Sequence, residues 1–452
     1  MRSQVAGIAW PAVLGGPLAR VLALLQQLDQ SQWWSAERLA EAQLAQAAPV
    51  LRYASARSPF FARRFGGLGL DPDRPLDAET WRSLPLLTRR DIQATGEELF
   101  CDPSPREHGA VGSTQTSGST GQPVTVRKTG LANLFWQAIT LREHDWHCRD
   151  VTATIASIRA FDPGKADPPD GLVADLWPGI VGKVYSSGRM GAMTLGTDIS
   201  LQVDWLLRLD PAYLLTYPSN LRGLLEAFRA GGTTLPKLHE IRTIGETVSD
   251  ELRRDCRNYF GAKVTDLYSS QEIGYLALQC PDSGLYHIQA EDVMLEVLDA
   301  EGRPCRPGEI GRVVATALHN FATPLIRYEI RDYAEVGPPC SCGRGLPTLR
   351  RVVGRQRNLL VMPSGERRWP LVGFKAYRDI APIAQYQIVQ KSLERIEVRL
   401  VAERPVTAEE EAKLGSLIQG FLGHPFALDF VYRPDIPQGP GGKFEEFISE
   451  VA

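Results

Sequence analysis

The chain has 452 residues, with 50 lysines and arginines against 53 aspartates and glutamates, so its formal net charge is −3. This length indicates two or three domains of ordinary size. The nearly neutral balance argues against a nucleic-acid partner, because phosphate-backbone binding requires a clustered positive field. With 43% hydrophobic and 23% charged residues, the composition is that of a globular protein rather than a disordered or fibrous one.

Cysteine usage and hydropathy indicate a cytoplasmic protein. Seven cysteines in a chain of this length do not form a secreted disulfide framework, and the odd number argues the same way. Pro11 and Pro17 interrupt the mildly apolar N-terminus, which is not typical of a signal peptide. No run of 18 apolar residues occurs, so we expect no membrane span.

The N-terminal part of the chain is predicted to be helical. Residues 18–65 are rich in Ala, Leu, Gln and Glu with apolar positions at near-helical spacing, which predicts two amphipathic helices. After a Pro- and Asp-rich connector, Thr88-Arg89-Arg90-Asp91 has the pattern of a capped helix start. A further helix is expected over residues 131–150.

Beyond residue 150, short apolar runs alternate with helical patterns. Strands are expected at 151–158, 213–216, 241–244 and 264–268, and helices at 219–230 and 250–260. This alternation predicts an α/β domain with mainly parallel sheets that bind ligands at the carboxyl ends of the strands. After residue 285 a β-rich subdomain is expected, with strands at 293–298, 310–315 and 359–362.

A short polar joint at Gly354-Arg355-Gln356-Arg357 marks the expected domain boundary. We place a large N-terminal domain at residues 1–354 and a small C-terminal domain at residues 355–452. The pattern beyond the joint predicts a small α+β domain, with a strand at 394–401, a helix at 407–422 and a strand at 429–432.

The stretch Thr114 to Pro123 reads Thr-Gln-Thr-Ser-Gly-Ser-Thr-Gly-Gln-Pro. Small residues let the backbone approach an anion closely, and hydroxyls and exposed amides can donate hydrogen bonds to phosphate oxygens. By composition alone, a flexible surface loop is an equal alternative. The stretch is not a Walker A loop, because the Gly-Lys-Ser/Thr ending is missing.

This loop closely resembles the phosphate-binding signature of the adenylate-forming enzymes, the superfamily of acyl-CoA synthetases, peptide-synthetase adenylation domains and luciferases. Four further motifs resemble theirs and occur in the same order: Tyr268-Ser269-Ser270-Gln271-Glu272, Tyr328-Glu329-Ile330-Arg331-Asp332, Gly354-Arg355-Gln356-Arg357, and Pro437 to Lys443. Five motifs in order over about 330 residues leave little room for chance.

Within the superfamily, the chain most resembles the phenylacetate-CoA ligase family. The shared features are Leu84-Pro85-Leu86-Leu87-Thr88, Gly245-Glu246, and Pro324-Leu325-Ile326-Arg327-Tyr328. The resemblance extends from about Leu51 to Val451. It implies a large α/β adenylation domain followed by a small, mobile α+β domain.

The resemblance also implies a role for each matching residue. ATP would be bound by Thr116, Ser117, Gly118, Ser119, Thr120, Gly121, Gly245, Glu246, Thr247, Tyr268, Asp332 and Arg355. Among these, Tyr268 would pack on adenine and Asp332 would accept hydrogen bonds from the ribose. Glu272 would bind Mg²⁺, Lys443 would act in adenylation, and Arg357 would be the hinge. Taken one at a time, Tyr268 would be a core residue and Lys443 a solvated one.

Three departures from the family pattern occur. Ser269 replaces the usual Gly of the tyrosine motif, and Arg331 replaces a frequent Gly before the aspartate. The loop at 362–370 is not the usual Gly-rich one. Because that loop usually shapes the CoA channel, its composition leaves the acceptor of the acyl group open.

Four potential metal ligands come from two short segments. Cys280 and His287 form one pair, and Cys340 and Cys342 lie in a Cys-x-Cys knuckle followed by Gly343. Three sulfurs and an imidazole suit a closed tetrahedral Zn²⁺ site, with buried or surface thiols as the alternative. The knuckle resembles one found in some phenylacetate-CoA ligase relatives. The other cysteines are expected to be packing residues.

The sequence therefore predicts an ATP- and Mg²⁺-dependent ligase that converts a small carboxylic acid, aromatic or similar, to an acyl-AMP and then to a CoA thioester. Transfer to an acyl-carrier-protein thiol or to an amine is a second hypothesis. A non-catalytic carboxylate- or nucleotide-binding relative is a third, against which the presence of Glu272 and Lys443 argues. A homodimer is left open. His144, Trp146, His147 and residues 213–220 are candidates for the acyl pocket or, equally, ordinary core residues.

Overall fold

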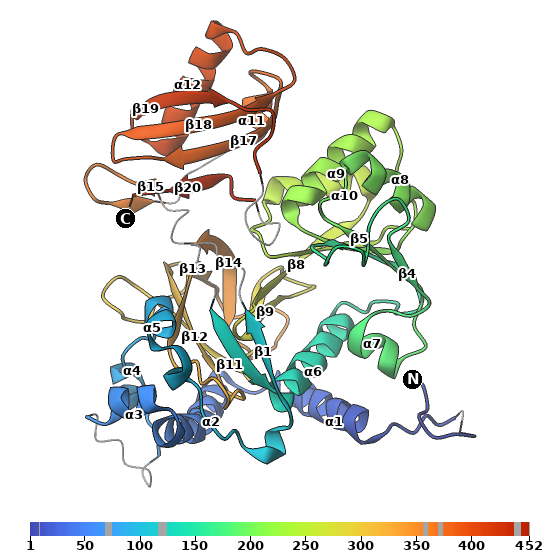
Figure 1. The fold of residues 1–452 in the computed structure, drawn as a ribbon, viewed down its shortest axis with the longest axis vertical. Coiled ribbons are helices and arrows are strands. Elements are labelled where there is room, and N and C mark those ends of the chain that lie inside the picture. Colours follow the sequence, from blue (N-terminus) through green and yellow to red (C-terminus); the bar gives the residue numbers. More distant parts are fainter. Residues whose placement is uncertain are drawn as a thin grey trace. The chain divides into compact units, whose positions relative to one another are not determined.

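The structure is a computed structural model that describes residues 1–8, 10–67, 75–115, 124–355, 360–368, 374–437 and 444–451 (Figure 1). It divides into two compact units, Met1–Val352 and Val353–Ala452. Each unit has its own hydrophobic core. Among the described residues, no helix is both long and apolar enough to cross a membrane.

The first unit begins with helices. They are α1 (Gly16–Ser31), α2 (Ala36–Arg57), α3 (Pro59–Phe65), α4 (Ala78–Ser83) and α5 (Arg89–Thr95), followed by the 3₁₀ turns Gly96–Leu99 and Arg106–His108. Three helices thus fill the region where the periodicity predicted two. Ser58 breaks the pattern, because its extended backbone ends α2 while its side chain accepts a hydrogen bond from Phe61 N and caps α3.

A large sheet forms the body of the first unit. Among the described residues it has twelve strands in the order β11-β12-β13-β14-β10-β9-β8-β7-β6-β3-β5-β4. The strands are β3 (Ile155–Arg159), β4 (Leu172–Ala174), β5 (Met190–Thr194), β6 (Tyr213–Thr216), β7 (Glu240–Ile244), β8 (Lys263–Ser270), β9 (Gly274–Gln279), β10 (Tyr286–Ile288), β11 (Val293–Leu298), β12 (Ile310–Ala317), β13 (Tyr328–Val336) and β14 (Thr348–Arg355). A separate hairpin, β1 (Val111–Gln115) and β2 (Thr125–Thr129), flanks the stretch 116–123.

The part of the sheet from β5 to β8 is parallel and is covered by helices on both faces. The helices are α6 (Gly130–Trp146), α7 (Gly179–Val184), α8 (Ile199–Leu209), α9 (Pro218–Gly231) and α10 (Asp250–Phe260). Alternate strand residues face the two layers, because side chains along a strand point to opposite faces. Ile155 packs with α1, α6 and α7, whereas Ala156 and Ile158 pack with α8, α9 and α10.

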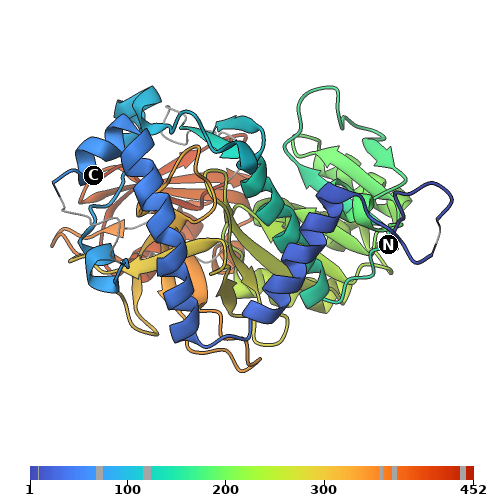
Figure 2. The ribbon, with the colours of Figure 1, turned by 90° about the horizontal axis from the view of Figure 1, so that it is seen from below.

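Helix α1 lies alongside α6, as Figure 2 shows from below. A fully buried guanidinium, that of Arg142 on α6, joins the two helices to the sheet. It donates to the carbonyl of Leu28 on α1, and its two terminal nitrogens lie 2.8 and 3.1 Å from the carboxylate oxygens of Glu291. Because a buried charge is tolerated only when it is paired, this contact fixes α6 against both neighbours.

The strand pairs β8–β9, β9–β10, β10–β14, β11–β12 and β12–β13 are antiparallel. This part of the sheet curls around its own core. Residues from strands that are far apart in the sheet order, such as Ala277 on β9, Val297 on β11 and Ala334 on β13, belong to one buried cluster. The pairing of β8 with β9 shifts between Tyr268 and Ser269, and such an irregularity bends a strand and redirects its side chains.

The second unit is a small α+β fold, as the pattern predicts. Its four-stranded sheet has the order β19-β18-β17-β20, formed by β17 (Ile383–Gln390), β18 (Arg395–Ala402), β19 (Ala427–Tyr432) and β20 (Phe447–Ser449). The hairpin of β15 (Leu360–Val361) and β16 (Arg367–Arg368) and the helices α11 (Phe374–Arg378) and α12 (Ala408–Leu422) complete it. A capping box between Thr407 and Glu410 begins α12 within one residue of the expected start.

One departure from the family pattern has a structural cost. Arg331 has φ +71°, a left-handed conformation that glycine adopts readily and that costs a side-chain-bearing residue about 1 kcal/mol or more. Ser269 is not among the residues with positive φ, so serine replaces glycine there without backbone strain.

We expect Arg331→Gly to raise the free energy of unfolding of the first unit by about 0.5–1 kcal/mol, because glycine removes the steric strain and loses only part of that gain to chain entropy. Denaturant unfolding of the full chain would measure it. Glu329→Gly, in the same strand but without positive φ, is the control and should lower stability. An equal loss in both variants would contradict the assignment of strain to Arg331.

Candidate functional site

The described residues include only part of the predicted nucleotide site. The following predicted residues lie outside them: Thr116, Ser117, Gly118, Ser119, Thr120, Gly121, Arg357 and Lys443. For Arg355, the structure gives only the backbone at the end of β14. The remaining predicted residues lie directly after β7, near the end of β8 and in the turn that follows it, and in the middle of β13.

The segment Gly245 to Thr247 follows β7 directly. Because Ile244 pairs with Leu267 in the parallel register, Gly245 and Tyr268 occupy the same level of the sheet. Gly245 has φ +77°, which favours glycine at this turn. The Glu246 carboxylate accepts hydrogen bonds from Ser219 N at 2.8 Å and from Ser219 Oγ at 3.0 Å, in the first turn of α9. Glu246 therefore holds the loop against the positive end of that helix.

Tyr268 and Asp332 are brought together by the curl of the sheet. The Tyr268 hydroxyl donates to Asp332 Oδ2 at 2.9 Å, although three strands separate β8 from β13 in the sheet order. Tyr268 is 7% exposed. The bond joins the two residues that the sequence assigned to the adenine and the ribose of one nucleotide.

Glu272 lies in the turn between β8 and β9 and is 9% exposed. Its Oε1 lies 3.5 Å from Nη1 of Arg89, the first residue of α5, and both side chains are nearly buried. Tyr328 lies beside the pair: burial and the Glu272 carboxylate raise the pKa of its hydroxyl, while Arg89 lowers it. From the sequence, Arg89 was predicted only to lie at a helix start, so the ion pair was not expected.

Lys128 on β2 is a second cation whose charge is coupled to the Glu272 carboxylate. Burial lowers the pKa of its ammonium, and the carboxylates of Glu272 and Asp292 act in the opposite direction. Asp292 Oδ1 itself lies 3.1 Å from Nδ1 of His319. Lys128 lies two positions after buried Val126 and therefore shares its face of β2. This alternation is the sequence signal that Lys128 lies on the inner face of the strand.

An aromatic pair lies beside the turn that holds Glu272, because Tyr275 lies at the start of β9, directly after that turn, and stacks on Trp136 of α6. Trp136 on α6 stacks on Tyr275, with ring centroids 4.0 Å apart and an interplanar angle of 13°. Trp136 remains 40% exposed and also lies over Gly274, where an added Cβ would be 3.5 Å from the indole. The Tyr275 hydroxyl lies 3.2 Å from the Thr140 hydroxyl. The stack presents an accessible aromatic face near the turn that holds Glu272.

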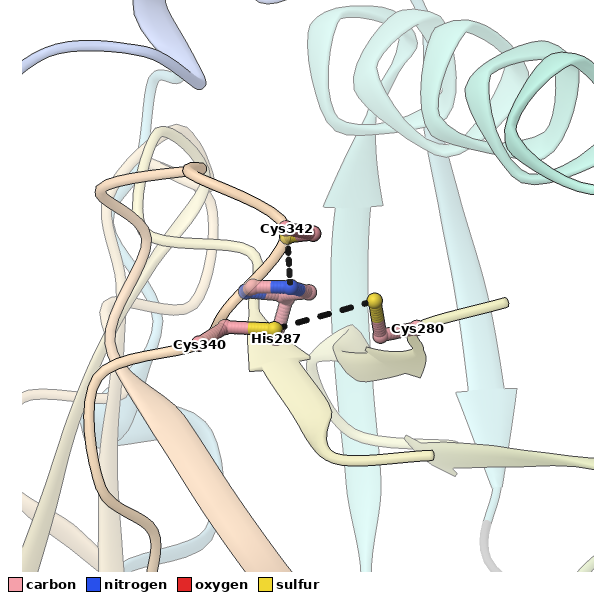
Figure 3. Close-up of side chains that lie close together, drawn as sticks. All are labelled: Cys280, His287, Cys340 and Cys342. Carbon is pink, nitrogen blue, oxygen red and sulfur yellow. Dashed lines mark hydrogen bonds between the residues drawn. The ribbon is translucent and has the colours of Figure 1, made fainter. Parts of the chain in front are cut away.

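The four residues of the predicted metal site converge (Figure 3). The ligand atoms of Cys280, His287, Cys340 and Cys342 all lie within 4.8 Å of one another. Cys280 Sγ is 3.8 Å from Cys340 Sγ, and Cys342 Sγ is 3.3 Å from His287 Nε2. A tetrahedron with Zn–S bonds of about 2.3 Å has edges of about 3.8 Å, so the sulfur spacing fits a zinc ion.

Neighbouring groups orient the cluster. His287 Nδ1 lies 3.4 Å from the carbonyl of Leu346, which favours the tautomer with its lone pair on Nε2, toward Cys342. Gly343 has φ +85°, as the predicted tight turn requires. Burial raises the pKa of the Cys280 thiol, but hydrogen bonds from His287 and Ser283 outweigh it and the pKa falls to about 5. A thiolate is the form that binds a metal.

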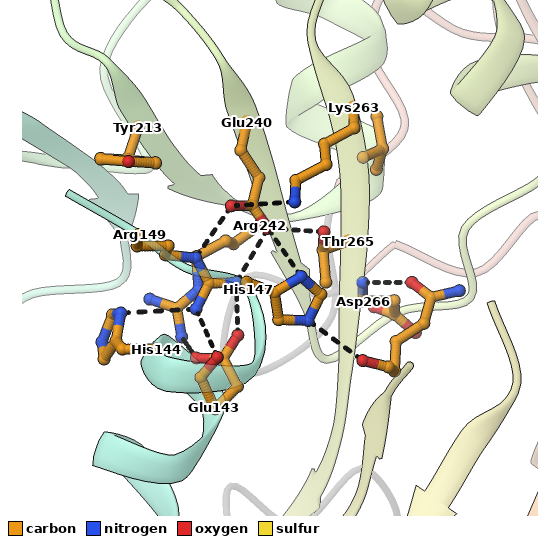
Figure 4. Close-up of polar contacts among 12 residues, drawn as sticks. Glu143, His144, His147, Arg149, Tyr213, Glu240, Arg242, Lys263, Thr265 and Asp266 are labelled. Atoms are coloured by element: carbon orange, nitrogen blue, oxygen red, sulfur yellow. Dashed lines mark hydrogen bonds and ion pairs between the residues drawn. The ribbon is translucent and has the colours of Figure 1, made fainter. Parts of the chain in front are cut away.

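A buried ion network lies between α6 and the strands β7 and β8 (Figure 4). Arg149 forms two 2.8 Å bonds with the Glu240 carboxylate and a 2.6 Å contact with Glu143. Arg242 donates to Glu143, and His147 Nε2 lies 3.0 Å from the carbonyl of Gln279. The charges of the two guanidiniums and the two carboxylates cancel, which is typical of a buried ion network with a structural role.

Three of the candidates for an acyl pocket are held in buried contacts. His144 Nδ1 lies 3.4 Å from Arg149, and His147 belongs to the ion network. Trp146 donates to the Gln32 side chain at 2.8 Å and packs edge-on against His287. These side chains therefore make buried contacts with the ion network or with His287, which is the ordinary core role that the sequence left open for them.

The chain is similar to known proteins in sequence and in fold. Residues 374–450 match the family described as the CapK C-terminal domain. The phenylacetate-coenzyme A ligase of Pseudomonas putida is 25% identical over 346 residues, which cover 74% of each chain. That of Escherichia coli (strain K12) is 24% identical over 348 residues, covering 74% of this chain and 75% of that protein.

The structure of 2-hydroxyisobutyryl-CoA ligase in the postadenylation state, in complex with R3-HIB-AMP, aligns with a TM-score of 0.69. Identity is 19%, over 90% of this chain and 89% of that chain. The fold is therefore that of the adenylate-forming CoA ligases, and the predicted fold class is confirmed. The chain is a relative of the phenylacetate-coenzyme A ligases, as its motifs predicted.

The buried histidines of the ion network generate a pH prediction. Burial and the neighbouring guanidiniums lower the pKa of His144 to about 3 and that of His147 to about 4. In the unfolded chain both groups titrate near 6.5, so between about pH 6.5 and 4 the unfolded state binds more protons. Stability is therefore fully present above pH 6.5 and is lost as the pH falls through this window.

We expect the melting temperature to fall as the pH is lowered from 6.5 to 4, with His147 contributing on the order of 2 kcal/mol. His147→Gln cannot titrate and should show a shallower fall. His239→Gln, at an exposed position, is the control and should keep the wild-type slope. Equal slopes in all three proteins would contradict the role of His147.

Proposed function

We propose that this protein activates a carboxylic acid with ATP as an acyl-AMP and transfers the acyl group to CoA. The observation that carries the proposal is the convergence of Tyr268 and Asp332 on one hydrogen bond, with Glu272 four residues after Tyr268. Relatives named phenylacetate-coenzyme A ligase support CoA as the acceptor, in preference to a carrier-protein thiol or an amine.

In this proposal the first unit binds the nucleotide. Asp332 accepts hydrogen bonds from the ribose hydroxyls, and the Tyr268 hydroxyl fixes the orientation of that carboxylate. Gly245 to Thr247 line the base, with the loop held by the contact of Glu246 with α9. The stretch Thr116 to Gly121 and Arg355 complete the set of ATP-binding residues proposed from the sequence.

Glu272 is the proposed ligand of Mg²⁺. A hard cation prefers oxygen ligands, and the nearest guanidinium nitrogen, at 3.5 Å, is farther than in a charge-assisted hydrogen bond of about 2.7–2.9 Å. The carboxylate thus has capacity for a further cation. When bound, Mg²⁺ would neutralise charge on the phosphates, while Glu272 keeps it beside the nucleotide site.

Lys443, in the C-terminal domain, is proposed to act on the transition state. A carboxylate is a poor acylating agent, and its attack on the α-phosphate places charge on the phosphoryl oxygens. A lysine brought in by rotation about Arg357 can stabilise that charge and then leave for the second step. The division of labour between domains 1–354 and 355–452 is part of this proposal.

An aromatic acid is the proposed substrate class. The exposed face of Trp136, stacked on Tyr275 near Glu272, can receive the ring of an aryl or arylacetic acid. The relatives named after phenylacetate support the same class.

The first experiment is carboxylate-dependent exchange between ATP and pyrophosphate, with aryl, arylacetic, fatty and amino acids and no acceptor added. We expect exchange with the aryl or arylacetic acids, followed by thioester formation when CoA is added. Exchange with none of the acids, in a protein that binds ATP, would favour the non-catalytic alternative. Thioester formation only on a carrier protein would favour the second hypothesis.

In the same assay, Lys443→Ala should slow exchange by about two to three orders of magnitude and leave the affinity for MgATP unchanged, because the charge acts mainly on the transition state. Lys413→Ala is the matched control. It removes a lysine of the same domain whose side chain is 61% exposed and paired with Glu409. Wild-type exchange in Lys443→Ala would contradict the proposed role.

We also propose that the cluster of Cys280, His287, Cys340 and Cys342 holds a structural Zn²⁺. Three sulfurs and one imidazole leave no open coordination position, and the site is largely buried. It joins the turn after β9 and strand β10 to the knuckle before β14. Adenylate chemistry requires no zinc, so the ion would act on folding.

We expect the purified protein to contain about one zinc per chain. Cys340→Ser should lose the metal and lower the melting temperature, because metal-binding energy is part of the folding energy. Cys148→Ser, at an exposed cysteine outside the cluster, should keep both. Absence of zinc from wild-type protein purified from zinc-supplemented cells would refute the proposal.

A further inference from the structure

Two cations from separate elements interact with one carboxylate of the proposed active site: Arg89 pairs with Glu272, and Lys128 is coupled to it electrostatically. Arg89 lies at the start of α5 and Lys128 lies on β2, the strand that follows the stretch 116–123. The Arg89 contact with Glu272 is 3.5 Å long, and both side chains are about one-eighth exposed. The start of α5 and the turn that holds Glu272 meet although their residues are 183 positions apart in the sequence.

Among the described residues, Lys128 has no partner for its charge. In the part of the chain that the structure describes, its ammonium has no hydrogen bond or ion pair, although it lies within electrostatic reach of Glu272 and Asp292. The Asp292 carboxylate is already in contact with His319. A largely buried ammonium without a partner is costly, so the position suits an anion that the described residues do not supply.

The buried network of Figure 4 shows what a structural ion cluster looks like in this protein. There, Arg149 and Glu240 form two bonds of 2.8 Å, and charges of both signs balance at 1% exposure. Around Glu272 the ion pair with Arg89 is longer, at 3.5 Å, and Lys128 has no ion pair among the described residues. The charges around Glu272 are therefore less tightly paired than those of the buried network.

We propose that Arg89 and Lys128 bind the β- and γ-phosphates of ATP beside Glu272 and stabilise the pyrophosphate as it leaves. The inference rests on the proposed function and adds two residues to its site. A planar guanidinium suits two phosphate oxygens at once, and an ammonium suits a concentrated charge.

The chemistry places charge where these cations lie. A carboxylate oxygen forms a bond to the α-phosphorus, and the bond from that phosphorus to the oxygen bridging to the β-phosphate breaks. The electron pair of the broken bond leaves with pyrophosphate. Negative charge therefore grows on the departing group, and Arg89 and Lys128 would act on it, while Lys443 acts on the α-phosphate.

The test compares ligands with and without the terminal phosphates. Calorimetry would measure the binding of MgATP, AMP and magnesium pyrophosphate to wild type, Arg89→Met and Lys128→Met. We expect each variant to lose about 30-fold or more in affinity for MgATP and pyrophosphate, and about twofold or less for AMP. Arg89→Lys and Lys128→Arg, which keep the charge, should recover most of the loss.

Lys165→Met is the matched control, because it removes a lysine that is 65% exposed in a surface pair. It should bind all three ligands as wild type does. Wild-type MgATP affinity in Lys128→Met, or a parallel loss of AMP affinity, would overturn the inference. If Arg89→Met does not fold, Lys128→Met decides alone, because its side chain holds no partner.

Failure of the proposed function would look different. A wild-type protein that binds MgATP more tightly than AMP but exchanges pyrophosphate with no acid contradicts the function, and the variants still test the two cations. A wild-type protein that binds neither nucleotide contradicts both.

Discussion

The hydrogen bond between Tyr268 and Asp332 depends on a sheet that bends back on itself. β8 and β13 have three strands between them, and only a strongly curled sheet can bring their side chains to 2.9 Å. The shift in pairing at Tyr268 and Ser269 supplies part of that bend, and a shared core fills its interior. The turn that carries Glu272 follows this bend directly, so the geometry of the proposed nucleotide site depends on the curvature of the sheet.

Much of this architecture could be predicted because its signals are local. The helix over 250–260 and the strand over 293–298 match the structure to the residue, since caps and alternation mark their ends. The metal cluster was predictable for another reason: cysteine and histidine are rare enough that four of them in two short segments point to one another. Their convergence needed only the antiparallel neighbours β9, β10 and β14.

Other features depend on contacts between residues far apart in the chain, which no local pattern encodes. Arg89 and Glu272 are 183 positions apart, and the sequence around either residue does not predict their ion pair. His144 and Trp146 were ambiguous because a buried polar aromatic looks the same in a pocket and in a core. Ser269 and Arg331 both replace a family glycine, yet only Arg331 has a positive φ, which the sequence alone does not distinguish.

The segment after the Cys340–Cys342 knuckle contacts the end of α1, so two segments that pack together are synthesised far apart in time. Arg344 donates to the Gln32 side chain across 312 positions, Gly345 N donates to the Gln32 carbonyl, and an added Cβ at Gly345 would lie 1.7 Å from the Trp34 carbonyl. At about 5–20 residues per second, roughly 15–60 s separate the two segments on the ribosome. The end of α1 therefore cannot complete these contacts until more than three quarters of the chain, through residue 345 of 452, has been synthesised.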